Sequence, residues 1–192
     1  MTAVVILAAG SSSRLGLPKQ NLSYKGETLL QLAVKNAFAV ADSVLVVLGA
    51  NRDAIEYTIK DQTVEVLYNP LWAEGMASSI RLAIEKIQSD YLHVTSVVLM
   101  LCDQPFADAA LLTELIIKAG STVKGIVASS YNNTLGVPAM FKANYFPYLL
   151  ALKGAEGAKK LITQHVDDIV AVPFPLGAVD IDTINDWQEF NK

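Results

Sequence analysis

Apolar runs of strand length alternate along the chain with segments whose apolar residues recur at helical spacing. Several runs are continuous in Val, Ile and Leu, which is typical of strands in a sheet covered on both faces. The alternation predicts an α/β fold, a three-layer sandwich around a mostly parallel sheet. The predicted strands span residues 3–7, 43–48, 64–68, 97–101, 125–130, 138–141, 169–172 and 179–181.

Helical patterns fill the intervals between these strands. Apolar residues from Met76 to Ile87 share one face at spacings of four, four and three. A second helix is predicted over 111–116, after an N-cap at Asp108, and residues 183–186 have the pattern of a capping box. No repeat, linker or low-complexity stretch interrupts the pattern, so we expect one domain over 1–192.

Composition narrows the classes of protein. Hydrophobic residues make up 52% of the 192 residues, which is ample for a buried core. No apolar run approaches the ~18 residues of a membrane span, and no signal peptide is visible. The single Cys102 allows no internal disulfide, and a net charge of −4 without a basic cluster argues against nucleic-acid binding. We therefore expect a cytoplasmic protein that binds neither membrane nor nucleic acid.

The first predicted strand leads into a loop of small residues that carries two cations, Arg14 and Lys19. Gly10 and the three serines after it let backbone N–H groups approach an anion, as in phosphate-binding loops. Five residues separate Gly10 from Gly16 and Lys19 comes three later, so the loop is no Walker A motif. A Gly/Ser-rich turn with surface cations is the alternative, but strand, glycines and cations fall in register for phosphate binding.

Acidic residues follow two other predicted strands. Asp103 ends a buried run, where a carboxylate is costly without a partner, and Mg²⁺ on a nucleotide would be one. Asp180 and Asp182 alternate on a short strand and so share a face. Each could instead be an ordinary turn or cap residue. Because ligands bind at the carboxyl ends of strands in such sheets, we expect these residues and the first loop to form one site.

Residues 69–79 read as a strand end, a proline turn, and a helix that opens with Gly75 and paired serines. Free N–H groups at a helix N-terminus and serine hydroxyls suit hydrogen bonding to a base edge or a ribose. A plain loop-to-helix entry would account for the same residues.

These motifs together resemble one family. The segment L-A-A-G-S-S-S-R-L-G-L-P-K at 7–19 is similar to the nucleotidyltransferase signature L-A-A-G-x-S-x-R-M-G-x-x-K, with Leu15 in place of Met. The elements C-D-Q-P at 102–105, D-I-D-T at 180–183 and N-P-L-W-A-E-G-M-A-S-S at 69–79 resemble further elements of that family, in the same order. The two alanines before the first glycine make the chain most similar to the molybdenum cofactor cytidylyltransferase family, within the MobA-like NTP transferase superfamily.

The resemblance implies a Mg²⁺-dependent nucleotidyltransferase with a GT-A-like Rossmannoid fold, which transfers CMP from CTP to the phosphate of molybdopterin and releases pyrophosphate. It implies that Arg14, Lys19 and Asp103 are catalytic, and that Asp103 and Asp182 bind the metal. Relatives that use GTP usually carry Gly in place of Ala9, so we expect CTP to be preferred. The implied nucleotide-binding residues are Leu7, Ala8, Ala9, Gly10, Ser11, Ser12, Asn69, Gly75, Ser78 and Ser79.

The second half of the chain carries the implied acceptor site. G-V-P at 136–138 and G-A-E-G-A at 154–158 resemble family elements there, with Gly136 and Pro138 as acceptor-binding residues. Residues 132–135 lack the Arg or His of relatives, and Ala155 replaces their Asp. A sugar phosphate or another phosphorylated alcohol is therefore the alternative acceptor, and a non-catalytic nucleotide-binding chaperone or regulatory module is a second alternative. With molybdopterin as acceptor, a molybdoenzyme or its chaperone would be a transient partner.

Overall fold

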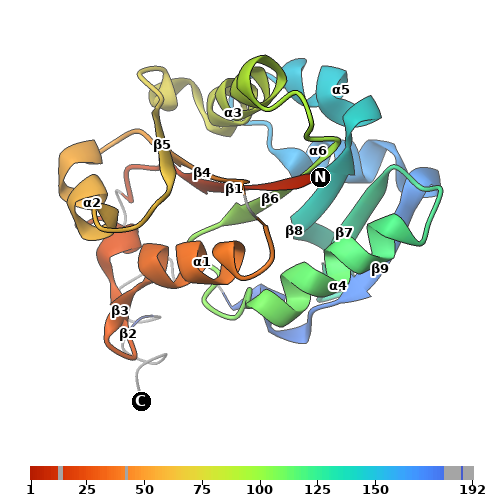
Figure 1. Cartoon of the computed structure of the whole chain (residues 1–192). Helices are drawn as coiled ribbons and strands as arrows, with labels where there is room; N and C mark the ends of the chain where they lie inside the picture. The colour runs from red at the N-terminus through yellow and green to blue at the C-terminus, as the bar shows by residue number, and fades with distance from the viewer. Residues whose placement is uncertain (13–14, 42, 180–186, 188–192) are drawn as a thin grey trace.

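The computed structural model describes residues 1–12, 15–41, 43–179 and 187 (Figure 1). A seven-stranded sheet has the order β5-β4-β1-β6-β8-β7-β9, and a two-stranded hairpin, β2-β3, lies apart from it. The sheet strands are β1 (Thr2–Ala8), β4 (Ser43–Leu48), β5 (Glu65–Tyr68), β6 (Ser96–Leu101), β7 (Ile126–Tyr131), β8 (Thr134–Lys142) and β9 (Ile169–Pro173). The hairpin strands are β2 (Ser23–Tyr24) and β3 (Glu27–Thr28).

The sheet is mostly parallel, as predicted, and β8 is the exception. It runs antiparallel between β6 and β7. The cause is local: Asn132 and Asn133, both with positive φ, connect β7 to β8. Two successive left-handed residues match the twist of a tight hairpin, and Asn adopts that conformation readily. The predicted strand at 179–181 and helix at 183–186 involve residues 180–186, which lie outside the described residues.

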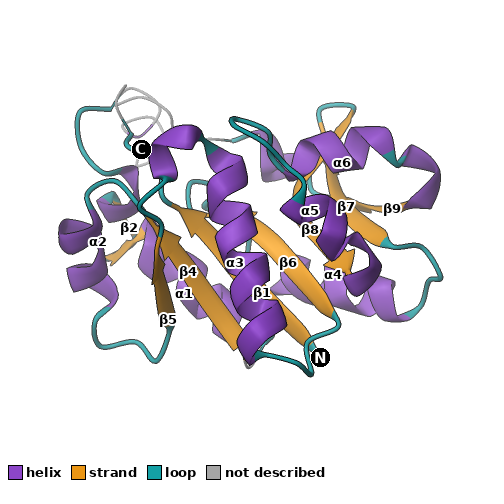
Figure 2. Ribbon diagram, turned by 90° about the horizontal axis from the view of Figure 1, so that it is seen from above, coloured by secondary structure: helices purple, strands orange, loops and turns teal. Residues whose placement is uncertain are grey.

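Helices cover both faces of the sheet, which confirms the predicted three-layer sandwich (Figures 1 and 2). One hydrophobic core joins one face to α1 (Leu29–Phe38), α2 (Arg52–Ile59) and α4 (Ala109–Gly120). The other core joins the opposite face to α3 (Met76–Asp90), α5 (Phe146–Leu150) and α6 (Ala158–Gln164). Alternate residues of β1 enter the two cores, because successive side chains of a strand point to opposite faces.

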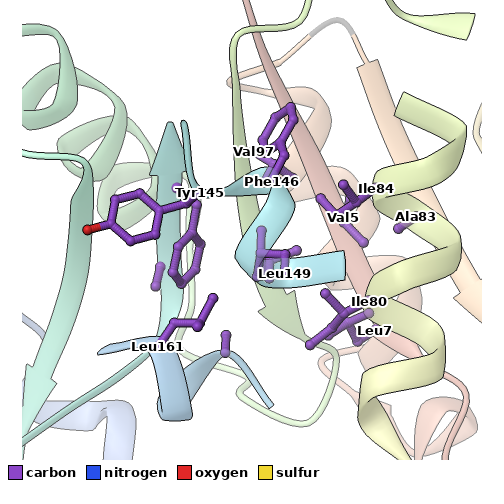
Figure 3. Close-up of a cluster of buried hydrophobic side chains, with 14 of the residues drawn as sticks. Val5, Leu7, Ile80, Ala83, Ile84, Val97, Tyr145, Phe146, Leu149 and Leu161 are labelled. Atoms are coloured by element: carbon purple, nitrogen blue, oxygen red, sulfur yellow. The ribbon is translucent and has the colours of Figure 1, made fainter. Parts of the chain in front are cut away.

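The predicted apolar face of 76–87 is the buried face of α3. Ile80 and Ile84 are fully buried and pack in the same cluster as Val5 and Leu7 of β1 (Figure 3). Burying each such side chain contributes about 1.5–3 kcal/mol. This packing holds the N-terminus of α3 beside the carboxyl end of β1, where the candidate site lies.

Two helix starts follow the rules of capping. The Asp108 carboxylate accepts a hydrogen bond from the N–H of Leu111 at 2.9 Å, which confirms the predicted cap of α4. Thr28 and Gln31 form a reciprocal capping box at the start of α1. None of the described helices is both long and apolar enough to cross a membrane.

Candidate active site

The strand order creates the site. β1 lies between β4 and β6, so the chain order changes direction at β1. Leu7, near the end of β1, pairs with Leu101 at the end of β6. The loop that follows β1 therefore lies beside Asp103, which comes two residues after β6. A crevice at such a switch point is where open α/β sheets bind ligands.

Two adjoining cavities occupy this crevice, with volumes of about 240 and 280 Å³. Between them they contact every implied nucleotide-binding residue except Asn69 and Ser78. The first is lined by Leu7, Ala8, Gly10, Ser12, Lys19, Gln20, Met76, Leu101, Cys102 and Asp103. The second is lined by Leu7, Ala9, Gly10, Ser11, Trp72, Ala73, Gly75, Met76, Ser79 and Leu101.

Lys19 and Asp103 form the charged centre of the first cavity. The Lys19 ammonium lies 3.0 Å from Oδ2 of Asp103, and the two side chains are 15% and 20% exposed. The other oxygen of Asp103, Oδ1, is buried and accepts no hydrogen bond. A buried carboxylate oxygen without a hydrogen bond is costly, so this oxygen is available to a ligand.

A divalent cation fits that oxygen, because hard cations prefer carboxylate ligands. Within 1–12, 15–41, 43–179 and 187, no three His, Cys, Asp or Glu side chains gather into a metal-binding group. Phosphate oxygens of a bound nucleotide would then complete the coordination that Asp103 begins. The predicted catalytic Arg14 and metal ligand Asp182 lie outside the described residues.

The loop after β1 is shaped by Ser12 and Gln20. Ser12 has a left-handed backbone (φ 52°), and its Oγ accepts the backbone N–H of Lys19 at 3.1 Å. The Gln20 amide donates to the carbonyls of Ala8 at 2.7 Å and Gly10 at 3.2 Å. Gln20 is 2% exposed and was not predicted as a site residue. Its place directly after Lys19 was the only available signal in the sequence.

Asn69 and Ser78 lie behind the cavity wall. Asn69 donates to the hydroxyls of Ser78 at 2.8 Å and Ser79 at 2.9 Å, and its Oδ1 accepts the N–H of Leu71. Ser78 in turn donates to the carbonyl of Gly75 at 2.8 Å. This network shapes the turn before α3 and leaves Gly75 and Ser79 to line the second cavity.

The turn at 154–158 packs directly on the start of α3. Gly75 has φ 116°, and a Cβ there would collide with the backbone of Gly154. The N–H of Ala77 donates to the carbonyl of Gly154 at 3.2 Å. The turn at 154–158, implied to bind the acceptor, thus packs against the start of α3, which is implied to bind the nucleotide.

Gly136 and Pro138, the residues implied for acceptor binding, line neither of the two cavities. Gly136 packs against the Tyr131 hydroxyl, and a Cβ would collide with it. The carbonyl of Pro138 accepts the Ser129 hydroxyl at 2.6 Å. These contacts are those of a strand interior, so the structure does not bring these two residues together with the nucleotide cavities.

Gln104 links the Asp103 segment to the second half of the chain. It is 5% exposed, and its amide donates to the carbonyls of Val137 at 3.2 Å and Gly177 at 3.3 Å. Its own carbonyl oxygen accepts no hydrogen bond. Gln104 belongs to the C-D-Q-P element at 102–105, but its role was not predicted from the sequence, because both of its partners are distant in the chain.

Cys102 lines the first cavity without being a candidate nucleophile. Burial, and then the neighbouring Asp103 carboxylate, raise the pKa of its thiol far above the usual value. A thiol kept neutral is a poor nucleophile. Cys102 is therefore a small apolar residue of the core.

A crevice at the strand switch, with a Gly/Ser loop and a lysine beside a carboxylate, is typical of an enzyme class that handles nucleotide phosphates. The chain matches the MobA-like NTP transferase domain over residues 4–169, and it belongs to this family. It is a nucleotidyltransferase, and its fold is the one predicted from sequence.

One curated relative and one solved structure match nearly the whole chain, and another curated relative matches about half of it. It is 28% identical to purine catabolism protein PucB of Bacillus subtilis, over 97% of this chain and 93% of PucB. It is 28% identical to molybdenum cofactor cytidylyltransferase of Escherichia coli, over 47% of this chain and 48% of that protein. The crystal structure of Rv0371c from Mycobacterium tuberculosis superposes with a TM-score of 0.84 at 29% identity, over 98% and 96% of the two chains.

The metal expectation is supported at the level of the family. Nucleotidyltransferases of this family use divalent metals, and Rv0371c has also been solved in complex with manganese. That complex superposes on this chain with a TM-score of 0.80 at 27% identity, over 99% and 97% of the two chains.

Proposed function

We propose that this nucleotidyltransferase transfers CMP from CTP to the phosphate of molybdopterin, with Mg²⁺ as the metal. The whole chain, 1–192, would act as one cytoplasmic domain. The observation that carries the proposal is the Lys19–Asp103 pair, which lines one cavity with Gly10 and Ser12 of the Gly/Ser loop while Asp103 Oδ1 has no hydrogen bond.

The reaction joins two phosphates. An oxygen of the acceptor phosphate attacks the α-phosphorus of CTP, the bond to the β-phosphate oxygen breaks, and pyrophosphate leaves. A phosphate monoester has a second pKa near ~6, so it is already a nucleophile at neutral pH and needs no general base. Catalysis then consists of holding the two phosphates in line and neutralising the charge that develops on pyrophosphate.

The residues divide this task. Lys19 and the second proposed cation, Arg14, neutralise the triphosphate and the leaving pyrophosphate. Backbone N–H groups of residues 10–12 approach the phosphates, as in other Gly/Ser loops. Mg²⁺, when bound, withdraws charge from the phosphate oxygens. Asp103, together with the proposed ligand Asp182, would hold it.

The choice of CTP rests on the second cavity. Ala9 lines that cavity beside Gly75 and Ser79. Its methyl group narrows the space that a larger purine would need, and a cytosine is smaller. The similarity to the Escherichia coli cytidylyltransferase, which extends over about half of each chain, supports the same choice.

A different phosphorylated acceptor is the second candidate. The long match to PucB, whose name indicates purine catabolism, favours it. So do the missing Arg or His at 132–135 and Ala155 in place of Asp. In this part of the chain, phosphate-binding groups would be backbone amides around Gly136, because Lys142 lies at the other end of β8 and its ammonium donates to the carbonyl of Thr122 at 2.6 Å.

The deciding experiment measures pyrophosphate release by the purified protein with each of the four NTPs, Mg²⁺, and either molybdopterin or a panel of sugar phosphates. We expect release with CTP and molybdopterin, and a higher kcat/KM for CTP than for GTP. A preference for GTP would overturn the cytidylyl assignment. Turnover of a sugar phosphate alone would overturn the molybdopterin assignment, and absence of all turnover would favour the non-catalytic module.

Binding gives an independent test of the acceptor. Titration with molybdopterin, in the presence of Mg²⁺ and a non-hydrolysable CTP analogue, should saturate. Replacing Gly136 by Val should abolish that binding, because the added side chain collides with Tyr131 and displaces the hairpin. The control is Val123→Ala, since Val123 is 97% exposed, and it should leave molybdopterin binding unchanged.

A further inference from the structure

We propose that Gln20 is a positioning residue for phosphate binding. Its hydrogen bonds tie the backbone next to Lys19 to the end of β1, and thereby place the Lys19 ammonium where the β- and γ-phosphates of the nucleotide would bind. The inference rests on the proposed role of Lys19 and does not depend on which base or acceptor the enzyme uses.

The hydrogen bonds of Gln20 join the two ends of the loop. Its amide nitrogen donates to Ala8, the last residue of β1, and to Gly10 within the loop, at 2.7 and 3.2 Å. Gln20 itself follows Lys19 directly in a 3-10 turn, Lys19–Asn21. The backbone that carries the Lys19 ammonium is therefore tied to the strand end that carries the loop amides.

Ser12 completes this arrangement. Its hydroxyl oxygen accepts the backbone N–H of Lys19 at 3.1 Å, and the hydroxyl donates to Oε1 of Gln20 at 3.5 Å. The left-handed backbone of Ser12 is a conformation that a non-glycine residue rarely adopts without support. Gln20 and Lys19 supply that support from the far end of the loop.

The chemistry explains why a glutamine stands here. The Ala8 carbonyl needs an N–H donor, and water does not supply one where Ala8 and Gln20 are each 2% exposed. A glutamate would set a negative oxygen against this carbonyl, and an apolar residue would leave it unsatisfied. Gln20 also lines the first cavity with Lys19 and Asp103, so a movement of its side chain changes the phosphate-binding wall itself.

The next residue, Asn21, provides a matched control. It lies in the same 3-10 turn and its amide also donates to a backbone carbonyl, that of Ala54, at 3.1 Å. Asn21 does not line the first cavity. If substitution merely weakens the turn, variants of both residues should lose affinity for pyrophosphate. If Gln20 positions the phosphate-binding group, only the Gln20 variant should lose that affinity.

The test uses pyrophosphate as the probe, because it is a product of any nucleotidyl transfer from an NTP. Calorimetry measures the affinity for pyrophosphate with Mg²⁺ in the wild type, Gln20→Met and Asn21→Leu, alongside their melting temperatures. We expect Gln20→Met to weaken pyrophosphate binding by about tenfold or more, the scale seen when a supporting hydrogen bond is removed behind a ligand-binding group. Asn21→Leu should bind pyrophosphate like the wild type even if its melting temperature falls.

Gln20→Glu adds a signature that general destabilisation would not produce. A protonated glutamic acid can donate one hydrogen bond, while the carboxylate can donate none. The affinity of this variant relative to the wild type should therefore recover as the pH is lowered. This variant also provides the test if Gln20→Met does not fold.

Three outcomes would overturn the inference. The first is wild-type affinity for pyrophosphate in folded Gln20→Met. The second is a loss of that affinity in Asn21→Leu equal to the loss in Gln20→Met. The third is an affinity of Gln20→Glu, relative to the wild type, that does not change with pH. Absence of pyrophosphate binding in the wild type would overturn the phosphate role of the whole loop. Normal pyrophosphate binding without turnover of CTP would overturn only the choice of base and acceptor, and would leave the role of Gln20 standing.

Discussion

Asp103 and Asp168 are two carboxylates with opposite surroundings. Asp168 has both oxygens satisfied: Oδ2 accepts the Tyr145 hydroxyl at 2.7 Å, and Oδ1 accepts the N–H of Gly125 at 3.0 Å. Asp103 has one oxygen on the Lys19 ammonium and one that is buried without a hydrogen bond. A carboxylate that serves stability is fully paired within the protein, whereas one that awaits a ligand retains an unpaired oxygen.

The same contrast appears in the groups around them. The hydrogen bond from Tyr145 holds the pKa of Asp168 below its usual value, and the N–H of Gly125 contributes in the same direction. Burial, and then the Asp168 bond, raise the pKa of Tyr145 to about 12, so its hydroxyl remains a donor at neutral pH. Near Asp103, Gln104 Oε1 is a second buried acceptor without a hydrogen bond. The Asp168 cluster is therefore complete in the protein alone, whereas the Asp103 region keeps buried acceptors that the proposed substrates and metal would use.

The largest expected effect is that of Asp103→Asn. The change keeps the size of the side chain but removes the charge that a hard cation prefers. We expect turnover to fall by on the order of 10³, and the binding of NTP with Mg²⁺ to weaken. Asp168→Asn is the matched control and should retain activity. Equal affinity for Mg²⁺-NTP in Asp103→Asn and the wild type, measured by calorimetry, would make Asp103 a turn residue.

Lys19→Ala should have the next largest effect. Loss of one preorganised cation costs turnover on the order of 10²–10³. The fold should survive, because Lys19 lies in a loop and contributes little to either core. The control is Lys35→Ala, which removes a lysine that is more exposed than Lys19 and is paired with Glu27. It should leave turnover unchanged. Wild-type turnover in Lys19→Ala with a native circular dichroism spectrum would remove Lys19 from the mechanism.

Asp168→Ala should have the opposite effect to Lys19→Ala: it should lower the stability of the fold and leave turnover intact. It leaves the hydroxyl of Tyr145, which is 4% exposed, without its acceptor. An unsatisfied buried donor costs about 1–3 kcal/mol. Urea denaturation should show this loss, while kcat/KM stays near the wild-type value. A large loss of activity in folded protein would contradict the division between the two carboxylates.

The smallest effect is the pH dependence of that stability difference. Because the pKa of Asp168 is lowered in the folded state, its contribution is present above the unfolded-state pKa of about 3.9. It is lost as the pH falls through the lower, folded-state pKa. The difference in unfolding free energy between the wild type and Asp168→Ala should therefore be constant near neutrality and shrink in acid. A difference that grows on acidification would contradict this sign.

The sequence determined most of the fold class. Continuous Val, Ile and Leu runs predicted β4 with its bounds unchanged and β1 and β6 within a residue of theirs. The spacing within 76–87 predicted the buried face of α3. These features depend on side-chain periodicity, which is local, so they can be read without the rest of the molecule. The loop after β1 and Asp103 were also predicted, because a motif at the end of a buried strand is a local signal.

Tertiary structure alone decided how these parts combine. Lys19 and Asp103 are 84 residues apart, and only the placement of β1 beside β6 brings them within 3.0 Å. The roles of Gln20, Gln104 and Asn69 were equally hidden, since each depends on which carbonyl or hydroxyl a folded neighbour presents to a buried amide. Strand order arises from the packing of both cores at once, and one-dimensional periodicity carries no information about which buried strands become neighbours.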